Sequence, residues 1–144
     1  MLSKEQARLF FLGGTFVVSV IFLAMTWHSI VREIPNQTHE QNITPEVVAG
    51  KQLFDENNCM GCHTILGEGA YYAPELTKVY GRKGEGYIKA VLMSPTPWQG
   101  AAQRKMVAYE MTEEEADNMV AFFKWIGEMD LNGFPPEPDK NLQP

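Results

Sequence analysis

The longest hydrophobic stretch of the chain lies near its N-terminus. Between Arg8 and Arg32 there are 23 residues without a formal charge, and apolar side chains occur all round the helix they would form. Such a helix, residues 9–31, would be roughly 34 Å long, which is enough to cross a bilayer core. A cleaved signal peptide would have a shorter apolar region and small residues at the cleavage site, which residues 24–27 do not provide. We therefore expect an uncleaved membrane-spanning helix within residues 1–33.

Polar residues and a proline follow the span, so residues 34–43 are interpreted as a linker. The next apolar residues recur at helical spacing and run to about residue 57. This helix has a typical start, with Thr44 as the N-cap, Pro45 in the first helical position and Glu46 in the first turn.

Two further helices are indicated closer to the C-terminus. Residues 85–93 carry apolar side chains on one face, and the prolines that follow end this short helix. Thr112 and Glu115 form a capping box before an apolar stripe that continues to about Gly127. Glycine and proline dominate between these elements, where we expect loops and a turn at residues 82–84.

These patterns predict an all-α protein in which a single N-terminal transmembrane helix precedes one small helical domain. The expected boundaries are 1–33 for the cytoplasmic N-terminus and membrane helix, 34–43 for the linker and 44–130 for the domain. Residues 131–144 are rich in proline, and we expect them to form an extended C-terminal tail. A length of 144 residues has room for one small domain and an appendage.

The chemistry of the chain is concentrated in one motif, Cys59-Met60-Gly61-Cys62-His63. C-x-x-C-H is the attachment signal of a c-type haem, in which two thiols form thioethers and the histidine is the proximal iron ligand. A zinc site would need about four ligands, and the chain has no second cysteine pair. A redox dithiol would leave His63 without a role. The motif therefore predicts one covalent haem c.

Four residues are candidates for the ligand on the other side of the iron: His39, Met93, Met106 and Met111. A methionine in the loop before the last helix is suitably placed to reach the distal face. Met111 directly precedes the helix cap and also resembles a hydrophobic staple, so we favour Met106. Methionine ligation raises the reduction potential and closes the iron to other ligands, which suits electron transfer.

Charge and cysteine usage indicate where the protein works. The net charge of -6 argues against a nucleic-acid partner. Covalent haem attachment takes place outside the bacterial cytoplasm, and Lys4 and Arg8 precede the span. The positive-inside rule then places the N-terminus in the cytoplasm and the haem domain in the periplasm of a single-pass inner-membrane protein.

Several separated motifs resemble a class I cytochrome c domain. They cover about residues 50–126 and are Gly50-Lys51-Gln52-Leu53-Phe54, the C-x-x-C-H motif, Pro74-Glu75-Leu76, Tyr80-Gly81-Arg82-Lys83, Lys105-Met106 and Met119-Val120-Ala121-Phe122-Phe123-Lys124.

The resemblance implies roles for individual residues. It implies that Gly50 and Phe54 cross the last helix at Met119 and Phe122. It also implies that the Pro74 carbonyl accepts a hydrogen bond from His63, that Arg82 lies near a haem propionate, and that Met106 is the sixth ligand.

A longer stretch resembles a narrower family, the cytochrome c subunits of bacterial nitric oxide reductases. It runs from Asn57 to Leu76 and includes Gly-Glu-Gly-Ala-Tyr at residues 67–71, which generic cytochromes c do not share. The single N-terminal span and the Phe134-Pro135-Pro136 tail are similar as well. Val107 is a departure, because many relatives have proline after the ligand methionine.

This narrower resemblance implies an electron-transfer subunit that performs no catalysis by itself. A soluble cytochrome c or cupredoxin would donate electrons, and a large membrane subunit with haem b, haem b3 and a non-haem iron would reduce nitric oxide. The resemblance also implies a calcium ion between the subunits, to which Gly69 and Tyr71 contribute.

Two alternatives remain open at this point. A free-standing membrane-anchored shuttle would share every haem residue but would need a long flexible tether, whereas the polar stretch here has only about ten residues. A gas sensor or haem enzyme would require that neither Met106 nor Met111 binds the iron.

Overall fold

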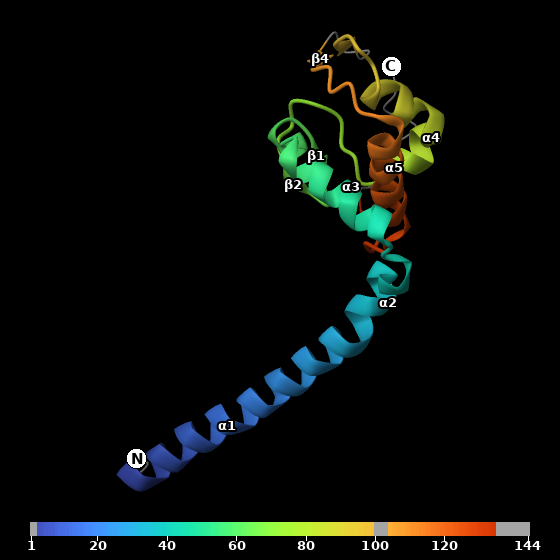
Figure 1. Cartoon of the computed structure of the whole chain (residues 1–144). Coiled ribbons are helices and arrows are strands. Elements are labelled where there is room, and N and C mark those ends of the chain that lie inside the picture. The colour runs from blue at the N-terminus through green and yellow to red at the C-terminus, as the bar shows by residue number, and fades with distance from the viewer. Residues whose placement is uncertain (1–2, 100–103, 135–144) are drawn as a thin grey trace, which may run out of the picture. The chain divides into compact units, whose positions relative to one another are not determined.

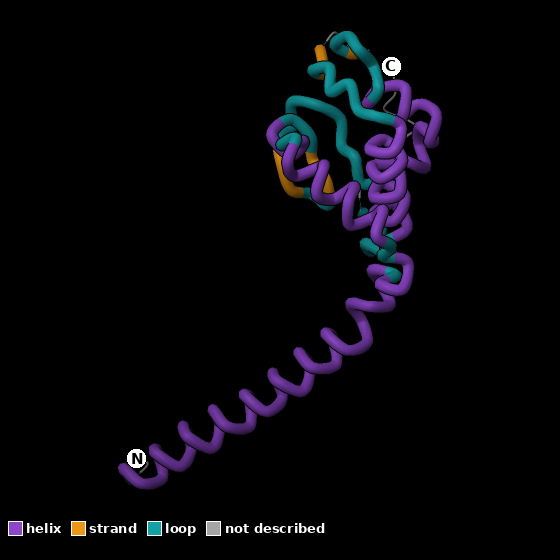
Figure 2. Tube along the Cα trace, in the orientation of Figure 1, coloured by secondary structure: helices purple, strands orange, loops and turns teal. Residues whose placement is uncertain are grey.

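The computed structural model describes residues 3–99 and 104–134. The chain divides into two compact units, residues 1–37 and 38–144, which are described separately below. Figure 1 labels the elements, and Figure 2 shows that helices dominate both units. The strands among the described residues are only two residues long, so the expected all-α class is confirmed.

The N-terminal unit is a long helix with no buried residue. Helix α1 spans Lys4–His28 and begins at a capping box, in which Ser3 and Gln6 exchange hydrogen bonds of 2.9 and 3.2 Å. The helical path continues through a π-helical turn, Ser29–Glu33, and through α2, Ile34–Thr38. By length and composition this helix can cross a membrane.

The linker expected at residues 34–43 is mostly helical. Pro35 lacks an N–H, and in a regular helix its ring would meet the carbonyl four residues earlier. The wider π-helical turn directly before it accommodates both effects, so the helix continues to Thr38. His39, at φ 48°, ends the helix, and a short 3-10 turn, Glu40–Asn42, follows.

The second unit is built around two helices that cross. Helix α3 spans Pro45–Glu56 and α5 spans Glu113–Glu128, and both start at the predicted caps. Thr44 accepts the N–H of Val47 at 3.4 Å, and Thr112 and Glu115 form the expected capping box. The core of the unit lies between these helices and α4.

Gly50 lies where α3 and α5 cross. A Cβ at this position would overlap the Asn118 carbonyl and lie 2.8 Å from Cβ of Phe122, so only glycine allows this approach. The Phe54 and Phe122 rings pack beside it with centroids 5.4 Å apart, as the resemblance implies. Met119 is buried in the same core.

Helix α4 is longer than predicted. It spans Val79–Leu92, whereas the sequence indicated a helix only from residue 85 and a turn at residues 82–84. The turn exists as a kink, because Gly84 has φ 75° and ψ 167° and separates two helical segments. The first segment was missed because it is only about one turn long.

Two small hairpins complete the unit. Strand β1, Thr64–Ile65, pairs antiparallel with β2, Glu68–Gly69, through a turn in which Leu66 and Gly67 both have positive φ. Strand β3, Trp98–Gln99, pairs antiparallel with β4, Lys105–Met106. The tail expected at residues 131–144 is described only to Phe134.

Candidate haem-binding site

The C-x-x-C-H motif forms a tight turn at the end of α3. Asn58, at φ 50°, reverses the chain, and Cys59–Gly61 form the 3-10 turn η3. The N–H groups of Cys62 and His63 donate to the Cys59 carbonyl at 3.2 and 2.9 Å. A Cβ on Gly61 would come within 2.7 Å of the Asn58 side chain. The turn therefore brings both thiols and the histidine onto one local structure.

The two thiols differ in environment. Cys59 is buried and Cys62 is exposed. Burial, assisted by the Asp55 carboxylate, raises the pKa of the Cys59 thiol to about 11. Cys59 is therefore protonated at neutral pH, unlike the low-pKa thiolate of a reactive dithiol. Among residues 3–99 and 104–134, no group of three or more His, Cys, Asp and Glu side chains could hold a metal ion.

His63 is fixed by a hydrogen bond to the backbone. Its Nδ1 lies 2.7 Å from the Pro74 carbonyl oxygen, the contact that the resemblance implies. A carbonyl can only accept, so Nδ1 carries the proton and Nε2 keeps its lone pair. In metal sites this arrangement orients the ring and makes Nε2 a stronger electron-pair donor to the metal.

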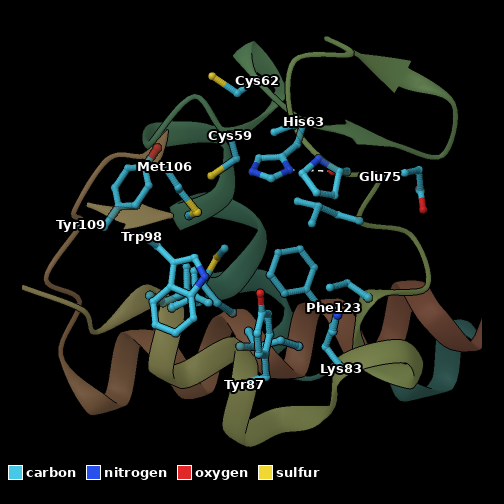
Figure 3. A pocket seen from close by; sticks show the side chains of 18 of the residues that line it. Cys59, Cys62, His63, Glu75, Lys83, Tyr87, Trp98, Met106, Tyr109 and Phe123 are labelled. Atoms are coloured by element: carbon cyan, nitrogen blue, oxygen red, sulfur yellow. Dashed lines mark hydrogen bonds between the residues drawn. The ribbon is translucent and has the colours of Figure 1, made fainter. Parts of the chain in front are cut away.

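A cavity of about 590 Å³ lies beside the motif. Figure 3 shows side chains from several elements around it, and the dashed line marks the bond between His63 and Pro74. The described residues that line it are Cys59, Cys62, His63, Tyr72, Ala73, Pro74, Glu75, Leu76, Val79, Arg82, Lys83, Tyr87, Ile88, Val91, Leu92, Trp98, Arg104, Lys105, Met106, Val107, Tyr109, Met119 and Phe123.

The size and chemistry of this cavity fit a haem. Its volume is typical of a cofactor pocket. The surface that lines it is mostly apolar, and the cavity is partly open to solvent. Such a cavity suits a large apolar group with one edge exposed, and both thiols and the imidazole of the motif border the same space.

Of the four candidates for the distal ligand, only Met106 borders the cavity. It lies in β4 opposite Trp98, so the hairpin presents its side chain. Met111 is buried in the core, where its N–H donates to the Leu92 carbonyl at 3.1 Å. Met93 follows α4, and His39 follows α2, outside the cavity lining.

Arg82 also borders the cavity, but its guanidinium is bound to Glu75. One nitrogen donates to the Glu75 carbonyl oxygen, and another lies 3.4 Å from the carboxylate. The residues expected to contribute to calcium binding lie near the motif: Gly69 is in β2, and Tyr71 is 82% exposed. A Cβ on Gly69 would overlap the His63 carbonyl, so this loop needs glycine.

The sequence alone did not identify the aromatic side chains of the cavity. Tyr87 and Trp98 meet edge to face with centroids 5.8 Å apart, and Lys83 lies 5.2 Å above the Tyr87 ring. Tyr87 falls within the apolar helix face predicted at residues 85–93, and the sequence pattern predicts no role for the segment around Trp98. The available signal was a tryptophan in an otherwise polar loop, which commonly marks a binding surface.

The comparisons with known proteins agree on one family. The cytochrome c family profile matches residues 47–127. The nitric oxide reductase C subunit of Stutzerimonas stutzeri is 38% identical over 138 residues, covering 93% of this chain and 94% of the relative. The corresponding proteins of Halomonas halodenitrificans and Paracoccus denitrificans are 36% and 34% identical, over 95% and 94% of this chain and 96% and 95% of the relatives.

The matched residues contain the C-x-x-C-H turn with His63 and the residues that line the cavity described above. The relatives also cover the N-terminal helix, because the alignments span nearly the whole chain. The chain therefore belongs to the cytochrome c family and, within it, to the C subunits of nitric oxide reductases.

Proposed function

We propose that this chain is the membrane-anchored electron-transfer subunit of a nitric oxide reductase. The observation that carries the proposal is the placement of His63 and Met106 at one cavity beside the two attachment thiols. Histidine and methionine together leave no position at the iron for a substrate, so this chain accepts and passes on electrons and does not reduce nitric oxide itself.

Each residue of the site has a distinct role in this proposal. Cys59 and Cys62 attach the haem through thioethers, which fixes its position relative to η3. His63 offers Nε2 because Pro74 holds the proton on Nδ1. Met106 offers its thioether from β4, and haem c supplies one-electron redox chemistry when bound.

The partners follow from the same proposal. A small periplasmic cytochrome c or cupredoxin donates the electron, and a large membrane subunit with haem b, haem b3 and non-haem iron receives it. Lys4 and Arg8 precede the apolar helix, which supports a cytoplasmic N-terminus and a periplasmic haem domain in the bacterial inner membrane. The relatives' names support a catalytic partner in a membrane complex.

We also propose that Gly69 and Tyr71 contribute oxygen ligands to a calcium ion shared with the large subunit. Calcium takes about six to eight oxygen ligands, so these residues alone form an incomplete site. Chelation of the isolated chain should therefore change neither its spectrum nor its stability, whereas chelation of the complex should weaken the association of the two subunits. Equal chelator sensitivity of both preparations would contradict this proposal, as would a complex that is unaffected.

The proposal is tested by purification from native membranes in mild detergent. We expect a large haem b subunit to be isolated together with the chain and the complex to consume nitric oxide when a reduced small donor is supplied. Recovery of the chain alone, with a haem c spectrum and no nitric oxide consumption, would favour a membrane-anchored electron shuttle instead.

A further inference from the structure

The hydrogen bond that orients His63 depends on a short backbone segment. On one side of Pro74, the Ala73 N–H donates to the Cys62 carbonyl at 2.8 Å. On the other side, the Leu76 N–H donates to the Thr64 carbonyl at 2.8 Å. Neither of these bonds involves the peptide that joins Pro74 to Glu75, whose carbonyl oxygen is the one in contact with His63.

Glu75 restrains the Pro74–Glu75 peptide because both its backbone and its side chain are hydrogen-bonded. Arg82 donates to the Glu75 carbonyl oxygen, and a second guanidinium nitrogen lies 3.4 Å from Oε2. The other carboxylate oxygen accepts the N–H of Thr77 at 2.6 Å. The side chain and the backbone of Glu75 are therefore clamped between α4 and the start of the next turn.

These contacts of Glu75 with Arg82 and Thr77, called the clamp below, are connected to the protein core. Thr77 is fully buried, and its hydroxyl accepts the N–H of Leu66 at 2.7 Å. Arg82 belongs to α4, whose Ile88 and Leu92 are also buried. A planar guanidinium suits this geometry because it presents several donors in a fixed fork, which a lysine ammonium does not.

We propose that Arg82 is a positioning residue for the haem ligand His63, acting through Glu75 and the Pro74 carbonyl. This role differs from the propionate contact that the family resemblance implies, and it rests on the proposed ligation of the haem by His63. A well-placed Pro74 carbonyl keeps the imidazole a strong donor to iron, which favours the oxidised state. A surface ion pair of this kind adds little to stability, so its loss should affect the ligand more than the fold.

The test uses the full-length haem protein in detergent, in the reduced state, with the histidines labelled for NMR. The first readout is the rate at which the His63 Nδ1 proton exchanges with solvent, because this rate reports the hydrogen bond to Pro74. Arg82→Gln and Glu75→Gln should each raise the rate by about tenfold, the factor expected for loss of one ordinary hydrogen bond.

The double variant, Arg82→Gln with Glu75→Gln, shows whether the two residues act on the Pro74 carbonyl together or independently. If Arg82 acts through Glu75, the double variant exchanges no faster than the faster of the two single variants. If Arg82 acts on a propionate instead, Glu75→Gln leaves the exchange rate unchanged, or the two effects add. Either of these results overturns the proposal.

Lys83→Gln is the matched control. Lys83 also borders the cavity and carries one positive charge, but it lies over Tyr87 and makes no bond to Glu75. In this variant the exchange rate of the His63 Nδ1 proton should stay within about twofold of the wild-type rate, as for an ordinary surface substitution. An equal rise in Lys83→Gln and Arg82→Gln would show a general charge effect and contradict the clamp.

The reduction potential gives a second readout that a purely structural role would not move. Compared with Lys83→Gln, which loses the same charge, Arg82→Gln should favour reduced iron by up to tenfold, or about 59 mV. Equal reduction potentials for Arg82→Gln and Lys83→Gln would overturn the proposal. If the wild type itself shows no low-spin, histidine-ligated iron, the proposed haem ligation fails, and this outcome is recognised before any variant is compared.

Discussion

Met106 and Met111 are five positions apart, and only Met106 borders the haem cavity. The sequence left both residues open as distal ligands, because a methionine before the last helix fits either assignment. The structure separates them by packing. Met111 is buried between the end of α4 and the start of α5, whereas the β3–β4 hairpin turns Met106 toward the cavity.

Replacement of these two methionines should therefore have different consequences. Met106→Ala removes the thioether that we propose as the distal ligand, and we expect the reduction equilibrium to shift toward the oxidised form by more than tenfold, or more than about 59 mV. Met111→Ala should leave the potential unchanged but destabilise the fold by about 2–5 kcal/mol through loss of core packing.

Redox titration and thermal unfolding of both variants measure these effects. A large potential shift in Met111→Ala, or none in Met106→Ala, would show that the distal ligand is assigned wrongly.

At the residue scale, the sequence predicted the attachment motif completely because its chemistry fixes the spacing. Cys59, Cys62 and His63 lie within five consecutive residues, so local structure alone brings them together. The contact between Arg82 and Glu75 was not predicted. It joins α4 to the loop after the haem motif, two segments that approach only in the folded domain.

Helices α3 and α5 depend on the absence of a side chain at Gly50. Gly50→Ala should destabilise the domain by about 1–3 kcal/mol, because the added methyl would overlap the Asn118 carbonyl on α5. Gly86→Ala is the matched control in α4, where a Cβ would meet nothing within 4 Å. That substitution should be neutral or stabilise by about 0.4–1 kcal/mol.

Chemical denaturation of both glycine variants, followed by circular dichroism, checks this expectation. Equal stability of Gly50→Ala and the wild type would mean that the helices can separate without cost.

The start of α5 should give the protein a measurable acid sensitivity. Hydrogen bonds from the backbone N–H and the hydroxyl of Thr112 hold the pKa of Glu115 below its ordinary value of 4.5. A lowered pKa means that the carboxylate stabilises the fold above about pH 4.5 and that this contribution is lost as the pH falls further.

We expect Glu115→Gln to unfold more easily than the wild type at pH 7, with the difference shrinking in acid. Thermal unfolding across this pH range measures it. Glu114→Gln provides the control, since Glu114 is in the same turn but outside the capping box. A difference between Glu115→Gln and the wild type that persists below the folded-state pKa would contradict the assignment.

At the element scale, the predictions succeeded where a side chain caps a helix and failed where the backbone deviates. The caps at Thr44 and Thr112 set both helix starts correctly. The first segment of α4 was missed because it is only about one turn long and the kink at Gly84 separates it from the rest of the helix. The helical residues before Thr38 were read as a linker because Pro35 usually ends a helix, and sequence alone does not reveal a π-helical turn.

For the whole molecule, the main question is whether the haem domain passes electrons within a complex or diffuses between complexes. A free shuttle needs a long flexible tether between its membrane anchor and its haem domain. Here the helix runs to Thr38 and α3 begins at Pro45, so few residues separate the two helices. This short connection favours a domain that stays with its partner at the membrane.

The most direct measurement is rapid mixing of the oxidised, purified complex with a reduced small donor in the absence of oxygen. The absorbance changes of haem c and haem b are then followed separately. We expect haem c to be reduced first and haem b to follow, since the electron reaches the large subunit through this chain. Reduction of haem b before haem c, or while haem c stays oxidised, would contradict the proposed function.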